Sequence, residues 1–335
     1  MKTLPKYSRI LPYSIQLRVP GFINHYYPGI ATLAPCPIQS EEWFDKFTDR
    51  VIQSLGRQYY PVCRMSDGEY RFLLGDQPLD ANWPLSARLK NRIQRCINYL
   101  NTDKSFSAGG LSDKGEILYV SGRYYEEEIK SIKDEYTRCL CEIAHDGTLA
   151  LHLTHGTPQP FQQHYFEALG RWLKDNGIVI DLENYVPFYF VYALLQGPKK
   201  DMIIKNRRIL VVHSANGSKK SAIIERLKTN GASKVHWLGI SQDRSCFDRL
   251  NPEEFIGKVD ICFVGAGVGK PMVLTQLKIL QVPCIDAGYV FEVWADPTKA
   301  HHRAYMLPDY DPLSANQPYL NTIERAHVCK LKKHC

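Results

Sequence analysis

The stretch VDICFVGAGVGKPMVLTQLKILQVPCID, residues 259–286, reads as a strand, a helix and a second strand. Residues 259–264 form an apolar run that predicts a buried strand, 270–281 predict a helix, and 282–286 predict the next strand. A helix of this length between two buried strands is typical of a βαβ unit, in which the two strands run parallel.

The same alternation continues toward the N-terminus. Residues 208–213 predict a strand, 218–228 a helix and 234–238 another strand. Short β-branched runs separated by helices of about ten residues indicate a parallel sheet that is covered on both faces. We therefore expect an α/β fold with a Rossmann-like, mostly parallel sheet and helices on both faces.

The first half of the chain adds elements of both kinds. A helix is predicted from Ser40 to Leu55, a strand over 59–65 and a short helix over 70–74. The remaining predictions are helices near 85–101, 126–145 and 161–176, strands near 148–153 and 178–182, and a buried helix over 184–196. We expect an irregular arm over residues 1–40, one α/β domain over 41–300, and an extension with a basic tail over 301–335.

Composition limits the classes of function. The chain has 335 residues, 44% of them hydrophobic, and a formal net charge of +7, which suits acidic ligands but is also common in soluble proteins. Basic residues are scattered without a nucleic-acid-binding motif, so we expect no nucleic-acid partner. The ten cysteines include no CxxC pair, which favours a reducing compartment over a zinc site. With no apolar run long enough for a membrane span, we expect a cytoplasmic protein.

The basic ending, residues 329–335, leaves two interpretations open. A cluster of lysines is attracted to anionic phospholipid, so the tail offers a peripheral contact with the inner face of the membrane. Chain ends are also commonly frayed, and a frayed tail is the favoured interpretation.

The turn after the first predicted strand is acidic and reads Arg64-Met65-Ser66-Asp67-Gly68-Glu69. Ligands of open α/β sheets collect at the carboxyl ends of strands. Two carboxylates separated by a glycine can face one cavity, and Mg²⁺ or Mn²⁺ prefers such oxygen ligands together with substrate phosphate. The alternative is an ordinary solvated loop, which is what an Asp-Gly-Glu turn usually is.

The glycine-rich turn at 265–270 follows a second predicted strand. Gly265, Gly267 and Gly269 would present backbone N–H groups to an anion, with Lys270 at the start of the helix. A P-loop would need Ser or Thr after Lys270, where this chain has Pro271, and a dinucleotide motif would need a glycine at 270. A tight strand-to-helix turn without a ligand remains the alternative.

A third candidate turn follows the predicted strand 208–213. His213, Ser214 and Asn216 could bind a base, a ribose or a phosphate. They could equally form the capped start of the next helix.

The ordered set of turns resembles the GT-D glycosyltransferases, bacterial enzymes with a Rossmann-like fold. In that family an Arg-x-x-Asp-Gly-Glu turn follows the first strand, and an Asp-x-Gly turn follows a glycine-containing strand end and a helix. Arg64, Asp67 and Glu69 match the first turn, and Asp286 and Gly288 match the second. The resemblance covers residues 45–295. This chain departs from the family at two places. It has Tyr289 where the family carries histidine, and Gly269-Lys270-Pro271 where the family carries a Gly-Pro-Thr type turn.

This resemblance implies a metal-dependent hexosyltransferase that uses a nucleotide-sugar donor, most simply a UDP-sugar. Asp67 and Glu69 would hold Mn²⁺ or Mg²⁺ beside the donor diphosphate, and the acceptor would be a glycan, a lipid-linked glycan or a glycoprotein. The candidate bases for an inverting reaction are Glu292, Asp286 and His213. The residues expected to line the donor pocket are Arg64, Ser66, Gly68, His213, Ser214, Asn216, Gly265, Gly267, Gly269, Lys270, Gly288 and Tyr289.

Two other functions remain open. A noncatalytic nucleotide- or glycan-binding protein would keep the fold without turnover, and Tyr289 is the departure that favours it. A nucleotide hydrolase or kinase would use 265–270 as a degenerate phosphate loop, against which the missing Ser or Thr after Lys270 argues.

Overall fold

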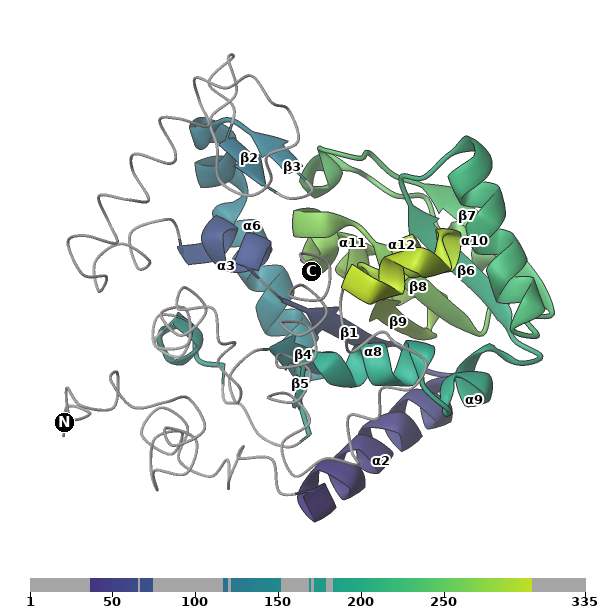
Figure 1. Cartoon of the computed structure of the whole chain (residues 1–335). Coiled ribbons are helices and arrows are strands. Elements are labelled where there is room, and N and C mark those ends of the chain that lie inside the picture. Colours follow the sequence, from purple (N-terminus) through teal and green to yellow (C-terminus); the bar gives the residue numbers. More distant parts are fainter. Residues whose placement is uncertain are drawn as a thin grey trace, which may run out of the picture.

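The computed structural model describes most of the region between the two predicted end segments (Figure 1). The described residues are 37–65, 67–74, 117–119, 122–151, 169, 172–178 and 183–302. The predicted helix 85–101, the predicted strand 178–182 beyond its first residue, most of the predicted helix 161–176, and nearly all of the predicted arm and extension lie outside them.

Seven strands form one sheet, and every pair of neighbours in it runs parallel. Their order across the sheet is β5-β4-β1-β9-β8-β6-β7. The strands are β1 (Tyr60–Arg64), β4 (Thr148–Leu151), β5 (Tyr185–Pro187), β6 (Arg208–His213), β7 (Lys234–Gly239), β8 (Ile261–Gly265) and β9 (Pro283–Asp286). The expected Rossmann-like α/β fold is confirmed.

Helices cover both faces of the sheet. On one face, α11 (Lys270–Gln276) packs against α6 (Glu126–Asp146), and α3 (Asp67–Leu74) lies on the same side. The other face carries α2 (Pro37–Ser54), α8 (Tyr189–Gln196), α9 (Lys200–Ile204), α10 (Gly217–Thr229) and α12 (Val290–Ala295). Figure 1 shows α10 and α12 side by side next to β6.

Strand β8 shows why the sequence forms this two-faced core. Its side chains alternate, so that Cys262 and Val264 join the core under α6 and α11, whereas Ile261 and Phe263 join the core under α10 and α12. A strand that is buried on both faces needs a continuous apolar run, because its alternate side chains enter two different cores.

Three predicted helix boundaries shift. Helix α2 begins at Pro37 rather than at Ser40, with proline in the first turn, where its missing N–H is not needed. Helix α3 begins at Asp67 rather than at Tyr70, so the acidic turn forms the first turn of the helix. Helix α11 ends at Gln276 and continues as a 3₁₀-helix to Leu280.

The predicted buried helix over 184–196 is wrong in its first part. Residues Tyr185–Pro187 form β5, and only Tyr189–Gln196 are helical. The residue before a proline is pushed toward extended conformations, so Val186 and Pro187 favour a strand over a continuous helix. The helix that follows is buried, as predicted.

Smaller elements were not predicted from the sequence. Helices α9 and α12 are short, and an antiparallel pair, β2 (Ile117–Tyr119) with β3 (Gly122–Tyr124), stands apart from the main sheet in Figure 1. None of the helices in the described part of the chain has the length and apolar character that crossing a membrane requires. The predicted domain boundaries stay predictions.

Candidate functional site

Four strands end at one edge of the sheet and bring the predicted turns together there. Strand β1 ends at Arg64, β9 at Asp286, β8 at Gly265 and β6 at His213. In the register of the sheet, His213 pairs with Gly265, and Val264 pairs with Asp286. Because all four strands run parallel, the segments that follow them leave from this same edge.

The chain leaves this edge toward opposite faces of the sheet. The segment after β8 enters α11 on the face that carries α6, whereas the segment after β6 enters α10, and the segment after β9 enters α12, on the other face. In open α/β sheets, ligands bind at the carboxyl edge beside neighbouring strands whose connections diverge in this way.

A cluster of four buried ionic side chains lies at this edge. The Nζ atom of Lys270 lies 2.6 Å from Glu69 Oε1 and 3.1 Å from Asp286 Oδ2. It also donates a hydrogen bond of 2.9 Å to the backbone oxygen of Arg64. The Arg64 side chain lies 3.5 Å from Asp286, measured from Nε to Oδ2. We call Arg64, Glu69, Lys270 and Asp286 the buried ionic cluster; two cations balance two carboxylates in it.

The Lys270 ammonium remains charged inside the protein. Burial by itself would lower the pKa of Lys270, but the carboxylates of Asp286 and Glu69 outweigh this effect, and the pKa is raised above its usual value. Among the described residues, neither carboxylate oxygen of Asp286 receives a hydrogen bond, although the side chain is fully buried; Oδ2 takes part in the ion pairs with Arg64 and Lys270, which leaves Oδ1. This oxygen is therefore the acceptor in the cluster that a ligand hydroxyl or a water molecule could satisfy.

Arg64 is held from two further sides. Its guanidinium lies over the ring of Tyr192, 4.7 Å from the ring centroid. Gly288 packs so closely that a Cβ there would lie 1.7 Å from an Arg64 guanidinium nitrogen, and its φ of +48° lies in the left-handed region. Glycine at 288 is thus required both for the backbone conformation and for space beside the arginine.

The glycines of the 265–270 turn are also tightly packed. A Cβ on Gly265 would meet His213 at 2.4 Å, and one on Gly269 would meet Ser245 Oγ at 2.4 Å. Gly267 has a positive φ of 52°. These contacts support the tight-turn interpretation, and Lys270 itself points into the buried ionic cluster. A P-loop lysine would instead reach a nucleotide phosphate, so the geometry disfavours the phosphate-loop alternative.

His213 is a neutral donor at the end of β6. Its Nδ1 accepts a hydrogen bond of 2.8 Å from the backbone N–H of Ala215, which fixes the ring proton on Nε2. Burial, reinforced by the charge of Lys219, lowers its pKa to about 4. The ring packs edge-on against Phe291 at 4.7 Å. His213 is therefore placed to donate a hydrogen bond from Nε2.

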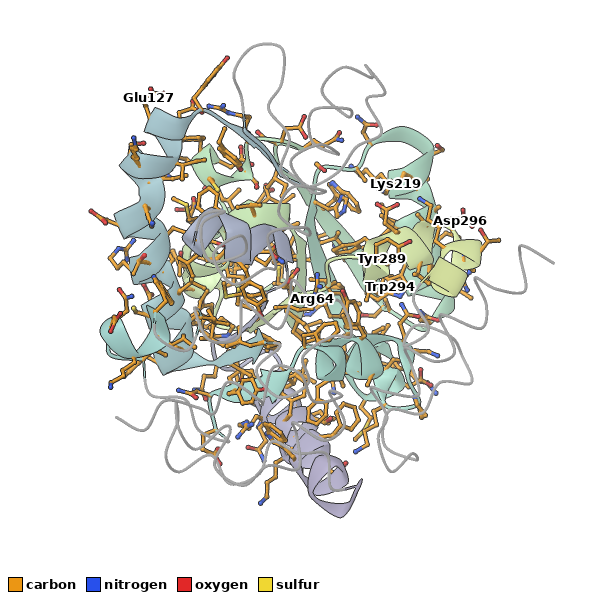
Figure 2. The ribbon with its side chains drawn as sticks, turned by 60° about the vertical axis from the view of Figure 1, so that its left-hand side comes forward. Arg64, Glu127, Lys219, Tyr289, Trp294 and Asp296 are labelled. Atoms are coloured by element: carbon orange, nitrogen blue, oxygen red, sulfur yellow. The ribbon has the colours of Figure 1, made fainter. Side chains whose placement is uncertain are left out.

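Glu292 lies in a second, half-exposed ionic group. Lys219 of α10 contacts one of its carboxylate oxygens, and Lys299 contacts the other at 2.6 Å. Burial alone would raise the pKa of Glu292, but these two lysines lower it overall. Tyr289, at the position where the GT-D family has histidine, donates a hydrogen bond of 3.5 Å to the backbone oxygen of Lys299. In Figure 2, Arg64 lies near the centre of the molecule, whereas Lys219 and Asp296 lie toward its outer side.

The structure does not describe every predicted site residue. Ser66 and the side chain of Asp67 lie outside the described part, Ser214 is half-buried, and Asn216 is exposed. Gly68 is buried in the first turn of α3. The roles assigned to all of these residues stay predictions.

The described side chains do not form a divalent-metal site. Glu69, one of the two predicted ligands, has its Oε1 bound to the Lys270 ammonium. No group of three or more His, Cys, Asp or Glu side chains with metal-binding geometry occurs in the described ranges. Metal binding by Asp67 with Glu69 stays an untested prediction because the Asp67 side chain lies outside the described part, and the Lys270 ammonium contacts Glu69 Oε1.

Several residues of the site were missed from the sequence. Tyr192, Lys219 and Lys299 contact predicted site residues from α8, α10 and the segment after α12. Lys219 could have been found, because it lies three residues after the predicted 213–216 turn. The contact of Tyr192 with Arg64 could not have been predicted from the sequence, because the place of Tyr192 on an apolar helix indicates only a core residue.

Comparisons of this chain with known protein-family models, with curated proteins and with solved structures find no match. The chain is therefore assigned to the α/β class with a parallel seven-stranded sheet, and to no narrower group.

Proposed function

We propose that this protein is a glycosyltransferase that binds a nucleotide-sugar donor at the carboxyl edge of β1, β9, β8 and β6. The observation that carries the proposal is the buried ionic cluster at the divergence of the strand connections. The cluster is built from the Arg-x-x-Asp-Gly-Glu turn, the glycine-rich turn and the Asp-x-Gly turn, the three motifs that resemble the GT-D glycosyltransferases.

Arg64 is the cation at the carboxyl edge that would suit a diphosphate. The buried ionic cluster is neutral as described. At the end of β6, the charges of Lys219 and Lys299 are met by Glu292 and by Asp296, which also acts on Lys299. Arg64 is held rigidly by Tyr192 and Gly288, so its guanidinium is preorganised. Preorganised cations are what stabilise the charge that develops on a departing nucleoside diphosphate.

The remaining groups would orient the substrates. His213 offers an Nε2–H donor that stays neutral at physiological pH, which suits a phosphate or ribose oxygen. Asp286 Oδ1 could accept a hydrogen bond from a sugar hydroxyl, because it receives none from the described residues. The two lysine partners of Glu292 lower its pKa, so it takes up a proton less readily than an unpaired glutamate.

The test is a calorimetric titration of nucleoside diphosphates and nucleotide sugars against the wild type and Arg64→Gln. We expect one nucleotide to bind, and the variant to weaken its affinity by at least about tenfold, as expected for the loss of a charge-assisted contact. The matched control is Arg208→Gln, because Arg208 is also ion-paired, to Asp260, but lies at the amino end of β6. If no nucleotide binds, or if both variants weaken binding equally, the proposal fails.

A noncatalytic nucleotide-binding protein is the second candidate. The observation that favours it is that Asp286 and Glu292 both form ion pairs with lysines, and that the lysines around Glu292 lower its pKa. Release of the nucleotide from the identified donor, with and without a panel of glycan acceptors, separates the two functions. A donor that binds and is never turned over would identify the binding protein.

A further inference from the structure

The Lys270 ammonium has the surroundings of a bound cation. It carries three N–H donors, and three oxygens lie within 3.1 Å of Nζ: Glu69 Oε1, Asp286 Oδ2 and the backbone oxygen of Arg64. The contact with the Arg64 carbonyl is a hydrogen bond, and the contacts with the two carboxylates are ion pairs. Two carboxylates and a carbonyl are also the oxygen ligands that a hard divalent cation prefers.

The three oxygens come from two distant parts of the chain, the segment 64–69 and Asp286. Arg64 ends β1, Glu69 lies in the first turn of α3, and Asp286 ends β9. Lys270 begins α11, and its side chain is only 2% exposed. The lysine therefore enters from its own helix and joins three elements at the carboxyl edge of the sheet.

A divalent ion would compete with this lysine for the same oxygens. A metal bound through Glu69 and Asp286 would have to lie next to the Lys270 ammonium and near the Arg64 guanidinium. Repulsion between like charges is strong where water is excluded. The described side chains also contain no alternative metal-binding group.

We propose that Lys270 is the resident cation of this site, standing where a divalent metal would otherwise bind, so that the protein takes its anionic ligand without a metal ion. The proposal replaces the metal-dependent mechanism expected from the GT-D resemblance. It rests on the proposed function only for the nature of the anionic ligand.

The first test is a titration of the wild-type protein with Mn²⁺. Binding is measured by calorimetry and by the paramagnetic signal of free Mn²⁺. We expect no saturable binding up to about 1 mM Mn²⁺, the range of weak affinities. Nucleotide affinity should change by less than about twofold when EDTA replaces Mn²⁺. One equivalent of Mn²⁺ bound by the wild type, and lost in Glu69→Gln, would overturn the proposal.

The second test removes the lysine. Lys270→Met keeps the length of the side chain but leaves Glu69 and Asp286 without their shared cation, and we expect it to bind Mn²⁺ at least about tenfold more tightly than the wild type. Lys278→Met is the matched control, because Lys278 also joins two carboxylates but lies at the surface. This control should leave Mn²⁺ binding unchanged.

The outcomes separate the two proposals. A folded Lys270→Met protein, judged by circular dichroism, that gains no Mn²⁺ binding would overturn the assignment of a cation position. If Lys270→Met does not fold, the wild type and Glu69→Gln decide the question. Absence of any nucleotide binding would refute the proposed function, whereas the Mn²⁺ titrations would still decide on Lys270.

Discussion

Two lysines of the α11 region form the same kind of ionic contact in opposite surroundings. Lys270 joins two carboxylates with 2% of its side chain exposed, and Lys278 joins two carboxylates with 47% exposed. The carboxylate partners are Glu69 and Asp286 for the first lysine, and Glu142 and Asp146 for the second.

The difference in exposure changes what each contact contributes. Water screens the surface contact, and ordering the long lysine side chain costs entropy, so such pairs contribute little. The buried charges have lost their hydration, and removing one partner strands the others in a medium that solvates them poorly. The same residue types therefore form a solvent-screened contact at one end of this segment and a buried ionic cluster at the other.

The largest expected effect is the loss of the buried lysine. Lys270→Met should lower the free energy of unfolding by about 3–5 kcal/mol, because two buried carboxylates lose their shared counter-charge. Urea unfolding at pH 7 measures this change. A loss below about 1 kcal/mol would mean that the buried contact behaves like the surface one.

The next largest effect is the loss of stability at low pH that is caused by the buried His213. The pKa of His213 is about 4 in the folded protein against 6.5 when unperturbed, so between these values the unfolded chain binds a proton that the folded chain does not. Stability is therefore full above pH 6.5 and falls as the pH drops toward 4, by about 3 kcal/mol. Urea unfolding at pH 7 and pH 4.5 should show this loss in the wild type and a smaller loss in His213→Asn.

The control for this prediction is His236→Asn. Burial also lowers the pKa of His236, which lies on β7 at the edge of the sheet and is less deeply buried than His213. Removing it should change the pH dependence less. Equal slopes for the two variants would contradict the difference in burial.

Alanine substitutions at Gly288 and Gly257 test whether close packing against Arg64 contributes to stability in addition to backbone strain. Gly288→Ala should cost about 2 kcal/mol and weaken nucleotide binding, since the new methyl group displaces the guanidinium. Gly257→Ala has a comparable positive φ of 69° but nothing within 4 Å of the new Cβ, so it should cost only the strain of about 1 kcal/mol. Thermal unfolding of both proteins measures the difference, and equal costs would remove the packing argument.

The smallest effect is expected at the surface. Lys278→Met should change the free energy of unfolding by less than about 1 kcal/mol, and the change should shrink further in high salt. Urea unfolding at low and high ionic strength checks both points. A large, salt-independent loss would show that exposure is a poor guide to the strength of these contacts.

Most of the sheet was predictable because its signal is local. Strands β6, β8 and β9 are short apolar runs bounded by polar or glycine-rich turns, and a buried parallel strand requires such a run. Strand β5 was missed because it lies within a longer apolar segment, where periodicity does not separate a buried strand from a buried helix.

The site was predictable as a set of turns but not as a set of contacts. Arg64, Lys270 and Asp286 were named from their turns, yet nothing local shows that the Lys270 side chain reaches back to the end of β1. That hydrogen bond joins residues 206 positions apart. The place of Lys270 in the donor pocket stays a prediction, and the contacts of its side chain with Glu69 and Asp286 could not be foreseen from the turn.

The bond from Lys270 to the backbone oxygen of Arg64 links the charges of the site to the end of a strand. The next amide, that of Met65, donates a hydrogen bond of 2.9 Å to Ala150 in β4. A ligand that draws Lys270 away from Arg64 would loosen this last rung between β1 and β4. Hydrogen–deuterium exchange at the Met65 amide would then act as a built-in reporter of occupancy, sensitive to ligands that themselves give no optical signal.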